Sequence, residues 1–249
     1  MQIQMIALLA LFVIAMLYSS VGHGGASGYL AVLVLAGYMR PDITPVVLIL
    51  NIAVASTGLF HYRRAGHFSF KLLKPLVFTS IPAAFVGGMI PLSDEIYAAL
   101  LGSTLLIAAL RFLFVGHIFK TRETSVLISH KTWALALGAV LGLLAGMVGV
   151  GGGIFLSPLL LFLGWADAKK TAAVSAAFIV LNSMSGLSAH LLLGAVIDWS
   201  LLSSIAATIY IGGFIGSFLG AWRLSLRMLQ QLLGSVLAIA SFKLIIKIW

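Results

Sequence analysis

Apolar residues are grouped along this chain into ten long runs that short polar stretches separate. Five runs, at about 3–19, 25–38, 44–60, 75–91 and 96–117, fill the first half. Five more, at about 133–147, 151–165, 171–193, 201–221 and 229–248, fill the second half. Apolar runs of this length are typical of helices surrounded by lipid. The pattern predicts an all-α polytopic membrane protein.

Only some of these runs are long enough to cross a bilayer. A helix rises about 1.5 Å per residue and the hydrocarbon core is about 30 Å thick. The runs at 25–38, 133–147 and 151–165 are too short, and the run at 3–19 is borderline. We expect each short pair either to dip into the membrane and return, or to form two short tilted spans joined by a tight turn.

Two sequence patterns occur twice, in the same order and about 130 residues apart. The glycine-rich Val21–Ala26 is repeated as Val148–Gly153, and Leu100–Ala108 is repeated as Leu232–Ala240. This duplication predicts one transmembrane domain over residues 1–249, with a repeat at about 1–117, a linker at about 118–131 and a second repeat at about 132–249.

Charge sets the expected orientation of the chain. Only 8% of the residues are charged, whereas soluble domains carry about 25%. Most of the charged residues are basic, so the chain has a net charge of +9. The basic residues gather in four polar stretches, at 61–74, 118–131, 166–170 and 222–228. Such loops are cytoplasmic in membrane proteins, so the charge indicates membrane orientation and no nucleic acid partner. Each repeat has an odd number of runs, which predicts inverted repeats, each with a glycine-broken short helix pair and three transmembrane helices.

The two glycine clusters are the first candidates for a binding site. Where a helix begins inside the membrane, its first amides have no partner within the helix, and water is scarce. Two such positive helix ends at one centre would attract an anion. The alternative role of glycine is close helix packing, which we expect for Gly87, Gly88, Gly212, Gly213, Gly216 and Gly220.

Rare polar residues inside the runs complete the candidate site. The chain has only two asparagines, Asn51 and Asn182, and each lies in the third run of its half. Their amides would either donate to substrate oxygens or bond across helices. His23 replaces a valine of the second cluster and would contact an anion, carry a proton or bond a carbonyl. The predicted substrate-binding residues are Gly22, His23, Gly24, Gly25, Asn51, Gly149, Gly151, Gly152, Gly153 and Asn182.

The sequence lacks the residue patterns of most membrane enzymes. No Asp or Glu lies in a predicted span, and the chain has no cysteine, no nucleotide-binding glycine-lysine loop and no zinc-binding His-Glu-x-x-His. We therefore expect no catalytic residues, no metal site and no cofactor. The absence of a buried acid also weakens coupling to protons or sodium through a carboxylate. His61 and His67 are assigned to the basic loop between the third and fourth runs.

The glycine cluster Gly149–Ile154 with Pro158, its degenerate copy Gly22–Gly25 and the two-repeat plan resemble the TauE/SafE family of membrane transporters. These are also called sulfite exporters or the toluene-sulfonate uptake permease family. The resemblance implies a multi-pass protein of the bacterial inner membrane that moves small sulfur-containing or organic anions. The first copy departs from the family pattern at His23 and Ala26 and has no matching proline.

Together these features favour a secondary transporter for a small anion such as sulfite or a sulfonate, working by alternating access. The alternatives are a passive anion channel and a membrane-embedded subunit of a larger complex. The expected partners are the anionic substrate and the lipid bilayer, with a coupling ion (proton or sodium) and a homodimer left open.

Overall fold

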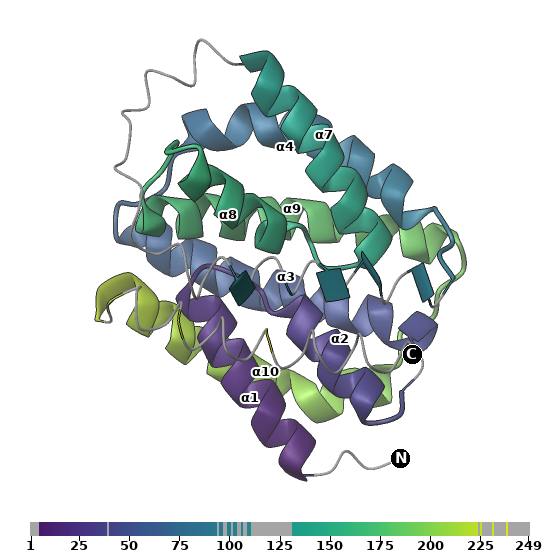
Figure 1. Cartoon of the computed structure of the whole chain (residues 1–249). Helices are drawn as coiled ribbons and strands as arrows, with labels where there is room; N and C mark the ends of the chain where they lie inside the picture. The colour runs from purple at the N-terminus through teal and green to yellow at the C-terminus, as the bar shows by residue number, and fades with distance from the viewer. Residues whose placement is uncertain are drawn as a thin grey trace.

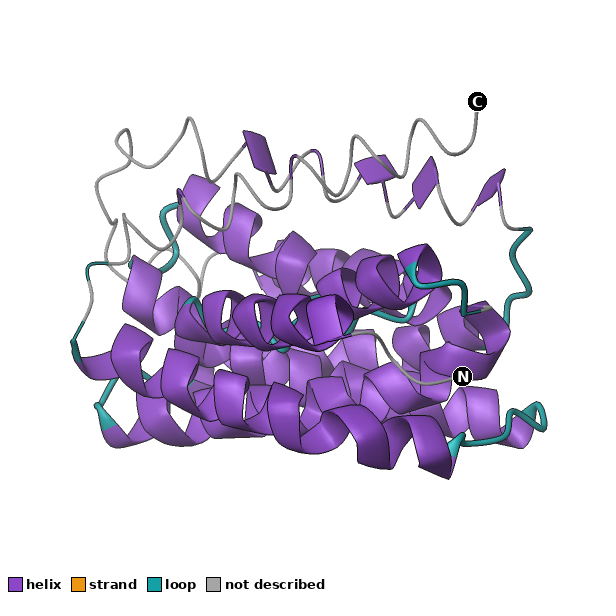
Figure 2. Cartoon of the chain, turned by 90° about the horizontal axis from the view of Figure 1, so that it is seen from below, coloured by secondary structure: helices purple, strands orange, loops and turns teal. Residues whose placement is uncertain are grey.

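The computed structural model describes residues 5–38, 40–93 and 131–223, together with isolated positions between 95 and 110 and at 225, 231 and 238. In these parts of the chain every regular element is a helix (Figure 2). The fifth runs of both halves, the second repeated pattern and the linker fall largely outside the described residues, so the predictions made for them stay predictions.

Eight helices match the first four runs of each half. The first half contains α1 (Met5–Ser20), α2 (Ala26–Leu35), α3 (Arg40–Arg64) and α4 (Phe70–Gly88), and the second contains α7 (Lys131–Val148), α8 (Gly153–Phe162), α9 (Ala168–Leu192) and α10 (Trp199–Trp222). Four of them, α3, α4, α9 and α10, are long and apolar enough to cross a membrane. The expected short helices are also present: α2 and α8 have 10 residues each.

All of these helices except α2 and α8 pack in three layers (Figure 1). Helices α4 and α7 form one outer layer, α1 and α10 form the other, and α3 and α9 lie between them. The short helix α2 packs on α3, and α8 packs on α9. Corresponding helices of the two halves therefore occupy corresponding places, and each outer layer combines one helix from each half.

Rows of glycine at every fourth position bring the outer pairs together. Gly212, Gly216 and Gly220 of α10 lie directly against backbone carbonyls of α1, the last of them against Ser20. Gly138, Gly142 and Gly146 of α7 lie in the same way against α4. Helices approach this closely only where the facing residue has no side chain. The packing role expected for Gly87, Gly88, Gly212, Gly213, Gly216 and Gly220 is confirmed, since a Cβ at each would meet a neighbouring helix.

These contacts also give the direction of each helix. Along α1 and α10, Phe12 lies at Gly212 and Ser20 at Gly220, so the two helices are parallel. The same reasoning makes α10 parallel to α3, α7 parallel to α4, and α4 parallel to α9. Helix α3 is antiparallel to α9, because Asn51 meets Ser183 whereas Gly58 meets Ala176. Helices α1, α3 and α10 therefore run one way, and α4, α7 and α9 run the other.

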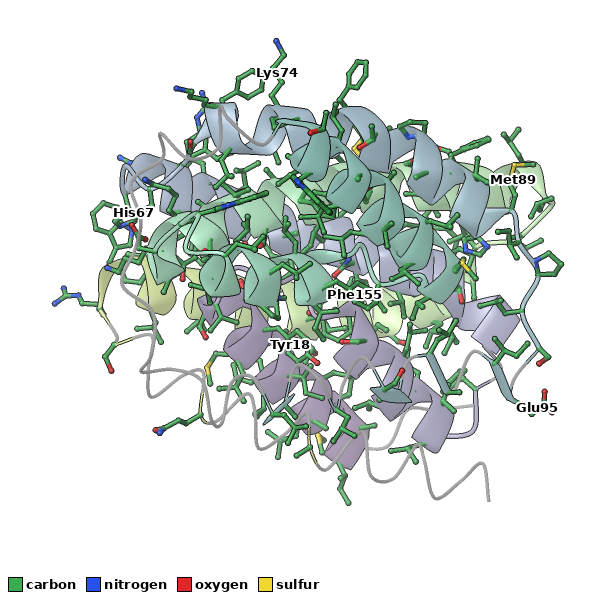
Figure 3. All side chains as sticks on the ribbon, turned by 45° about the horizontal axis from the view of Figure 1, so that its top comes forward. Tyr18, His67, Lys74, Met89, Glu95 and Phe155 are labelled. Atoms are coloured by element: carbon green, nitrogen blue, oxygen red, sulfur yellow. The ribbon has the colours of Figure 1, made fainter. Side chains whose placement is uncertain are left out.

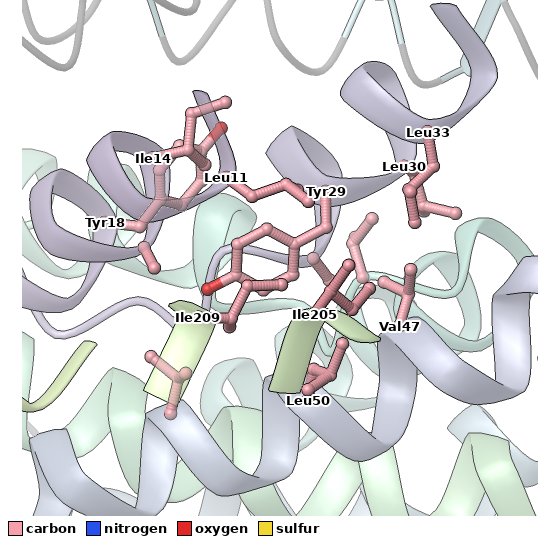
Figure 4. Close-up of a cluster of buried hydrophobic side chains, with 14 of the residues drawn as sticks. Leu11, Ile14, Tyr18, Tyr29, Leu30, Leu33, Val47, Leu50, Ile205 and Ile209 are labelled. Atoms are coloured by element: carbon pink, nitrogen blue, oxygen red, sulfur yellow. The ribbon is translucent and has the colours of Figure 1, made fainter. Parts of the chain in front are cut away.

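An apolar cluster holds α1, α2, α3 and α10 together (Figure 4). Leu11 and Tyr18 of α1, Leu30 of α2, Val47 of α3 and Ile205 of α10 are almost completely buried in it. Large apolar side chains also cover the outside of the bundle, where Phe78 is 75% exposed. Such an outer surface is stable in lipid and would not be stable in water.

The ends of the bundle differ in charge. At one end the Lys169 ammonium donates to the Ala221 carbonyl (3.2 Å), which joins the start of α9 to the end of α10. His67 lies at the same end: partial burial and then the nearby Lys169 lower the pKa of this histidine. Figure 3 shows His67 and Lys74 far from Glu95, which lies toward the opposite end. Two of the four basic stretches, 61–74 and 166–170, are described and lie toward this end, and the other two fall largely outside the described residues, so the orientation stays a prediction.

The assignment of His61 to the basic loop is wrong. Helix α3 continues to Arg64 and ends in a turn at Gly66, whose φ is 81°. His61 is therefore a helical residue, and only 5% of its surface is exposed. Polar residues at 61–64 suggested a loop, but they do not end a helix whose backbone bonds continue to Ala65.

Candidate functional site

The first glycine cluster breaks the chain between α1 and α2. Gly22 and Gly25 have φ of 80° and 98°, a left-handed conformation that only glycine adopts at little cost. The His23 amide still bonds the Tyr18 carbonyl (2.9 Å), so α1 closes in a tight turn before the chain reverses. The break therefore joins two helices by a short turn that is buried inside the bundle.

The second glycine cluster makes the corresponding break between α7 and α8. Here three glycines are left-handed: Gly149 (71°), Gly151 (71°) and Gly152 (78°). The amides of Gly149 and Val150 close the end of α7 on the Ala145 carbonyl. Helix α8 then begins at Gly153, and no side chain caps its first turn.

Asn51 joins the two breaks. Its Oδ1 accepts from the amide of Ala26, the first residue of α2 (3.1 Å). Its Nδ2 donates to Ser183 Oγ of α9 (2.8 Å) and, over 3.4 Å, to the Val150 carbonyl in the second break. Asn51 is completely buried near the middle of α3. The structure therefore brings both glycine clusters to one residue and uses both amide hydrogens of that residue in doing so.

The absence of side chains in the clusters makes room for this contact. A Cβ at Gly24 would overlap Asn51 Oδ1, and a Cβ at Gly151 would overlap Ser183 Oγ. Two other cluster glycines lie against α9: Gly22 against the Ala172 backbone, and Gly153 against the Ile179 side chain. Gly24 and Gly151 are therefore the glycines nearest to the polar centre, whereas Gly22 and Gly153 let the breaks pack on α9.

Several backbone amides at the breaks are buried donors. Among the described residues, no acceptor is bonded to the amides of Gly24, Gly25, Gly151 or Gly152, and all four residues are buried. Buried amides are nearly always hydrogen-bonded in proteins. The two breaks thus present a small group of N–H donors around Asn51, and such donors suit oxygen atoms that carry negative charge.

Asn182 does not repeat the arrangement of Asn51. Its Nδ2 donates to the Phe178 carbonyl of its own helix (2.8 Å), and its Oδ1 has no hydrogen-bond partner although the residue is 1% exposed. Phe178 lies beside Gly152, and Gly186, one turn beyond Asn182, lies beside Gly146. Asn182 is therefore on the α9 face that covers the second break, but it does not bond across to the first half.

His23 is buried in the first break. Its Nδ1 is 3.2 Å from the Val21 carbonyl, and the ring of Tyr18 lies edge-on to it at 6.2 Å between centroids. Tyr18 in turn bonds Ser27 of α2 (3.0 Å). His23 thus contacts its own turn, close to the start of α2, and also the backbone of Gly153 at the start of α8. No group of three His, Cys, Asp or Glu residues within the described part of the chain is arranged to hold a metal ion.

Three polar contacts at the site could not be assigned from sequence alone. Ser183 is the partner of Asn51 across the two halves. The Tyr29 hydroxyl bonds the Gly24 carbonyl (2.6 Å), and Ser157 of α8 bonds Ser175 of α9 (2.8 Å). Ser183 and Ser188 both follow Asn182 in the same apolar run, and nothing in the sequence distinguishes Ser183 from Ser188, which bonds only its own helix.

Known proteins resemble this chain over almost its whole length. The family model for the sulfite exporter TauE/SafE matches residues 7–244. A curated protein named "Probable membrane transporter protein y4hK", from Sinorhizobium fredii, is 33% identical over 245 residues, which cover 95% of this chain and 96% of the relative. No solved structure matches. With four apolar helices long enough to span a bilayer, the chain is a multi-pass membrane protein, of the inner membrane in bacteria, and it belongs to the TauE/SafE family.

Proposed function

We propose that the protein is a secondary transporter for a small oxyanion, with sulfite or a sulfonate as substrate. The observation that carries the proposal is the set of buried amides at Gly24, Gly25, Gly151 and Gly152, which have no acceptor among the described residues. A membrane interior offers no water to satisfy them. A bound oxyanion would supply several acceptor oxygens at once, and the family's association with sulfite makes a sulfur oxyanion the first choice.

The helix directions support an anion over a cation. Helix α2 starts beside Asn51 and runs back along α3 toward Val47 (Figure 4). Helix α8 starts beside Ile179 and runs back along α9 toward Ser175. Because α3 and α9 are antiparallel, α2 and α8 run in opposite directions, and both N-termini lie near Asn51. Each helix N-terminus carries about half a positive charge.

The packing of the helices fits inverted repeats. Corresponding helices, such as α1 and α7 or α3 and α9, run in opposite directions, and each packs on the partner that symmetry would give it. Two halves related in this way can exchange conformations and open a central site to one face and then the other. We therefore include alternating access in the proposed mechanism, with Asn51 at the pivot between the halves.

The transport claim is tested in proteoliposomes loaded with unlabelled sulfite or methanesulfonate. A transporter takes up labelled substrate in a saturable way, and substrate trapped inside stimulates the uptake by exchange. A channel gives flux that rises linearly with concentration, with measurable single-channel currents. Failure of every small sulfur oxyanion to move, at protein densities that preserve the fold, would overturn the proposal.

A further inference from the structure

A second polar cluster lies away from the anion site, where α3 packs on α10. His61 Nδ1 is 2.8 Å from Ser217 Oγ, and Ser217 Oγ is within donor distance of Thr57 Oγ1 (3.3 Å) and of the Phe214 carbonyl (3.1 Å). Thr57 donates to the Val54 carbonyl of its own helix (2.8 Å). All three side chains are buried.

We propose that His61 is the proton-binding residue of this transporter, so that substrate movement is coupled to a proton. This inference rests on the proposed transport function. Histidine is the side chain that normally gains or loses a proton near neutral pH. No Asp or Glu lies in the four candidate spans, which leaves histidine as the residue type there that can exchange a proton at such pH.

The hydrogen bonds around His61 suit both of its protonation states. In one neutral form, the Ser217 hydroxyl donates to Nδ1. When Nδ1 carries a proton, it donates to Ser217 Oγ, and the Ser217 hydrogen turns to Thr57 Oγ1 or to the Phe214 carbonyl. The network therefore reverses without leaving a buried group unpaired. A histidine that only joins two helices needs one such arrangement, whereas a residue that loads and releases a proton needs two.

The surroundings of His61 also allow a positive charge there. His61 lies one turn before the end of α3, where the helix dipole favours a cation. The rings of Phe60, Phe214 and Phe218 surround the imidazole at 4.8–5.9 Å between centroids. Among the described residues, Arg64 on the same helix carries a like charge that disfavours protonation of His61, and the described part of α10 that faces the ring contributes only Ser217 and phenylalanines.

His61 lies on the same helix as the anion site and contacts a helix of the other half of the chain. Asn51 is on the same helix, ten residues away, which corresponds to about 15 Å along the axis. Ser217 belongs to α10, from the other half of the chain. A change in the charge of His61 therefore acts on a contact between α3 and α10, two helices from different repeats.

The test separates exchange from proton-driven accumulation in proteoliposomes. His61→Asn places an amide nitrogen where Nδ1 lies and keeps the bond to Ser217, but it does not take up a proton. A one-unit pH gradient should drive about tenfold accumulation per coupled proton in the native protein. In His61→Asn we expect accumulation close to onefold, with exchange at equal pH retained, and no substrate-dependent proton uptake reported by a trapped pH dye. His67→Asn, in the loop, should behave as the native protein.

Other outcomes would overturn the proposal in distinguishable ways. If the native protein exchanges substrate but a pH gradient drives no accumulation, the proton coupling is wrong while transport stands. If His61→Asn still accumulates substrate tenfold, another residue carries the proton. If His61→Asn and His61→Gln both lose exchange as well, His61 is part of the packing. Absence of any exchange in the native protein refutes the transport function itself.

Discussion

The two breaks have the same glycine pattern but different partners. In the first, the start of α2 is capped by Asn51 from α3, and the Tyr29 hydroxyl bonds the Gly24 carbonyl. In the second, no side chain of the described residues caps α8, and the asparagine at the matching position of the repeat, Asn182, bonds its own helix. Glycine spacing therefore sets the shape of both turns, while the side chains around them bond the first amide of α2 and leave the first amide of α8 without a side-chain acceptor among the described residues.

This difference suggests unequal roles. In the first break the Ala26 amide, the first of α2, is already bonded to Asn51, whereas no side chain of the described residues accepts from the Gly153 amide, the first of α8. The second cluster is also the copy that contains the fuller glycine run, Gly149 to Gly153. We expect changes in the second break to affect substrate affinity most, and changes at Asn51 to affect stability more than changes at Asn182.

The largest effect is expected from Gly151→Ala. Residue 151 is left-handed, and a Cβ there would overlap Ser183 Oγ. Backbone strain of about 1–2 kcal/mol and overpacking of about 1–3 kcal/mol should together cost roughly 2–5 kcal/mol, seen as a lower thermal unfolding temperature in detergent and loss of uptake. Gly194→Ala is the matched control. Gly194 is also left-handed, with φ of +85°, but no atom lies within 4 Å of the position its Cβ would take. Equal losses in the two variants would contradict the crowded geometry of the break.

Asn51→Ala should be more destabilising than Asn182→Ala. The first change leaves the Ala26 amide, the Val150 carbonyl and Ser183 buried without their partner, at roughly 2–5 kcal/mol. The second removes one bond within a helix and should cost less than about 1 kcal/mol. Thermal unfolding measures both, and titration with sulfite shows whether Asn182→Ala lowers affinity. If Asn182→Ala unfolds at a lower temperature than Asn51→Ala, the hydrogen bonds assigned to the two asparagines are wrong.

Ser183→Ala should have a smaller effect that is still measurable. It removes the acceptor for Asn51 Nδ2 and leaves only the long contact to Val150, at a cost of about 0.6–1 kcal/mol. Ser188→Ala on the same helix is the control, because Ser188 bonds only the Met184 carbonyl and is exposed. If both variants unfold at the same temperature, the bond between the halves contributes nothing measurable.

The positions of the helices were predictable because a helix in lipid needs a long, nearly uninterrupted apolar run. The runs at 44–60 and 201–221 became Arg40–Arg64 and Trp199–Trp222, with errors only at the ends. The ends were missed because polar residues such as Arg63 and Arg64 can continue a helix beyond the apolar core. His61 was misplaced for the same reason, and with it the contact to Ser217.

The side-chain partners were not predictable from one sequence. Asn51 and Asn182 occupy matching positions of the repeat, which suggested matching roles. Their hydrogen-bond partners depend on which helix of the other half lies opposite. Asn51 bonds Ser183 only because α3 packs on α9 at the height of these two residues. Sequence spacing on a single helix does not contain this information.

The central claim is that backbone amides at both breaks bind the anion, and it can be observed directly. In protein labelled with ¹⁵N-glycine, titration with sulfite should shift the amide signals of Gly24, Gly25, Gly151 and Gly152 with one saturation curve, which matches the concentration dependence of uptake. The signals of Gly66 and Gly194, in left-handed turns with open surroundings, should not move. Saturable uptake with no change at the four cluster glycines would contradict the account.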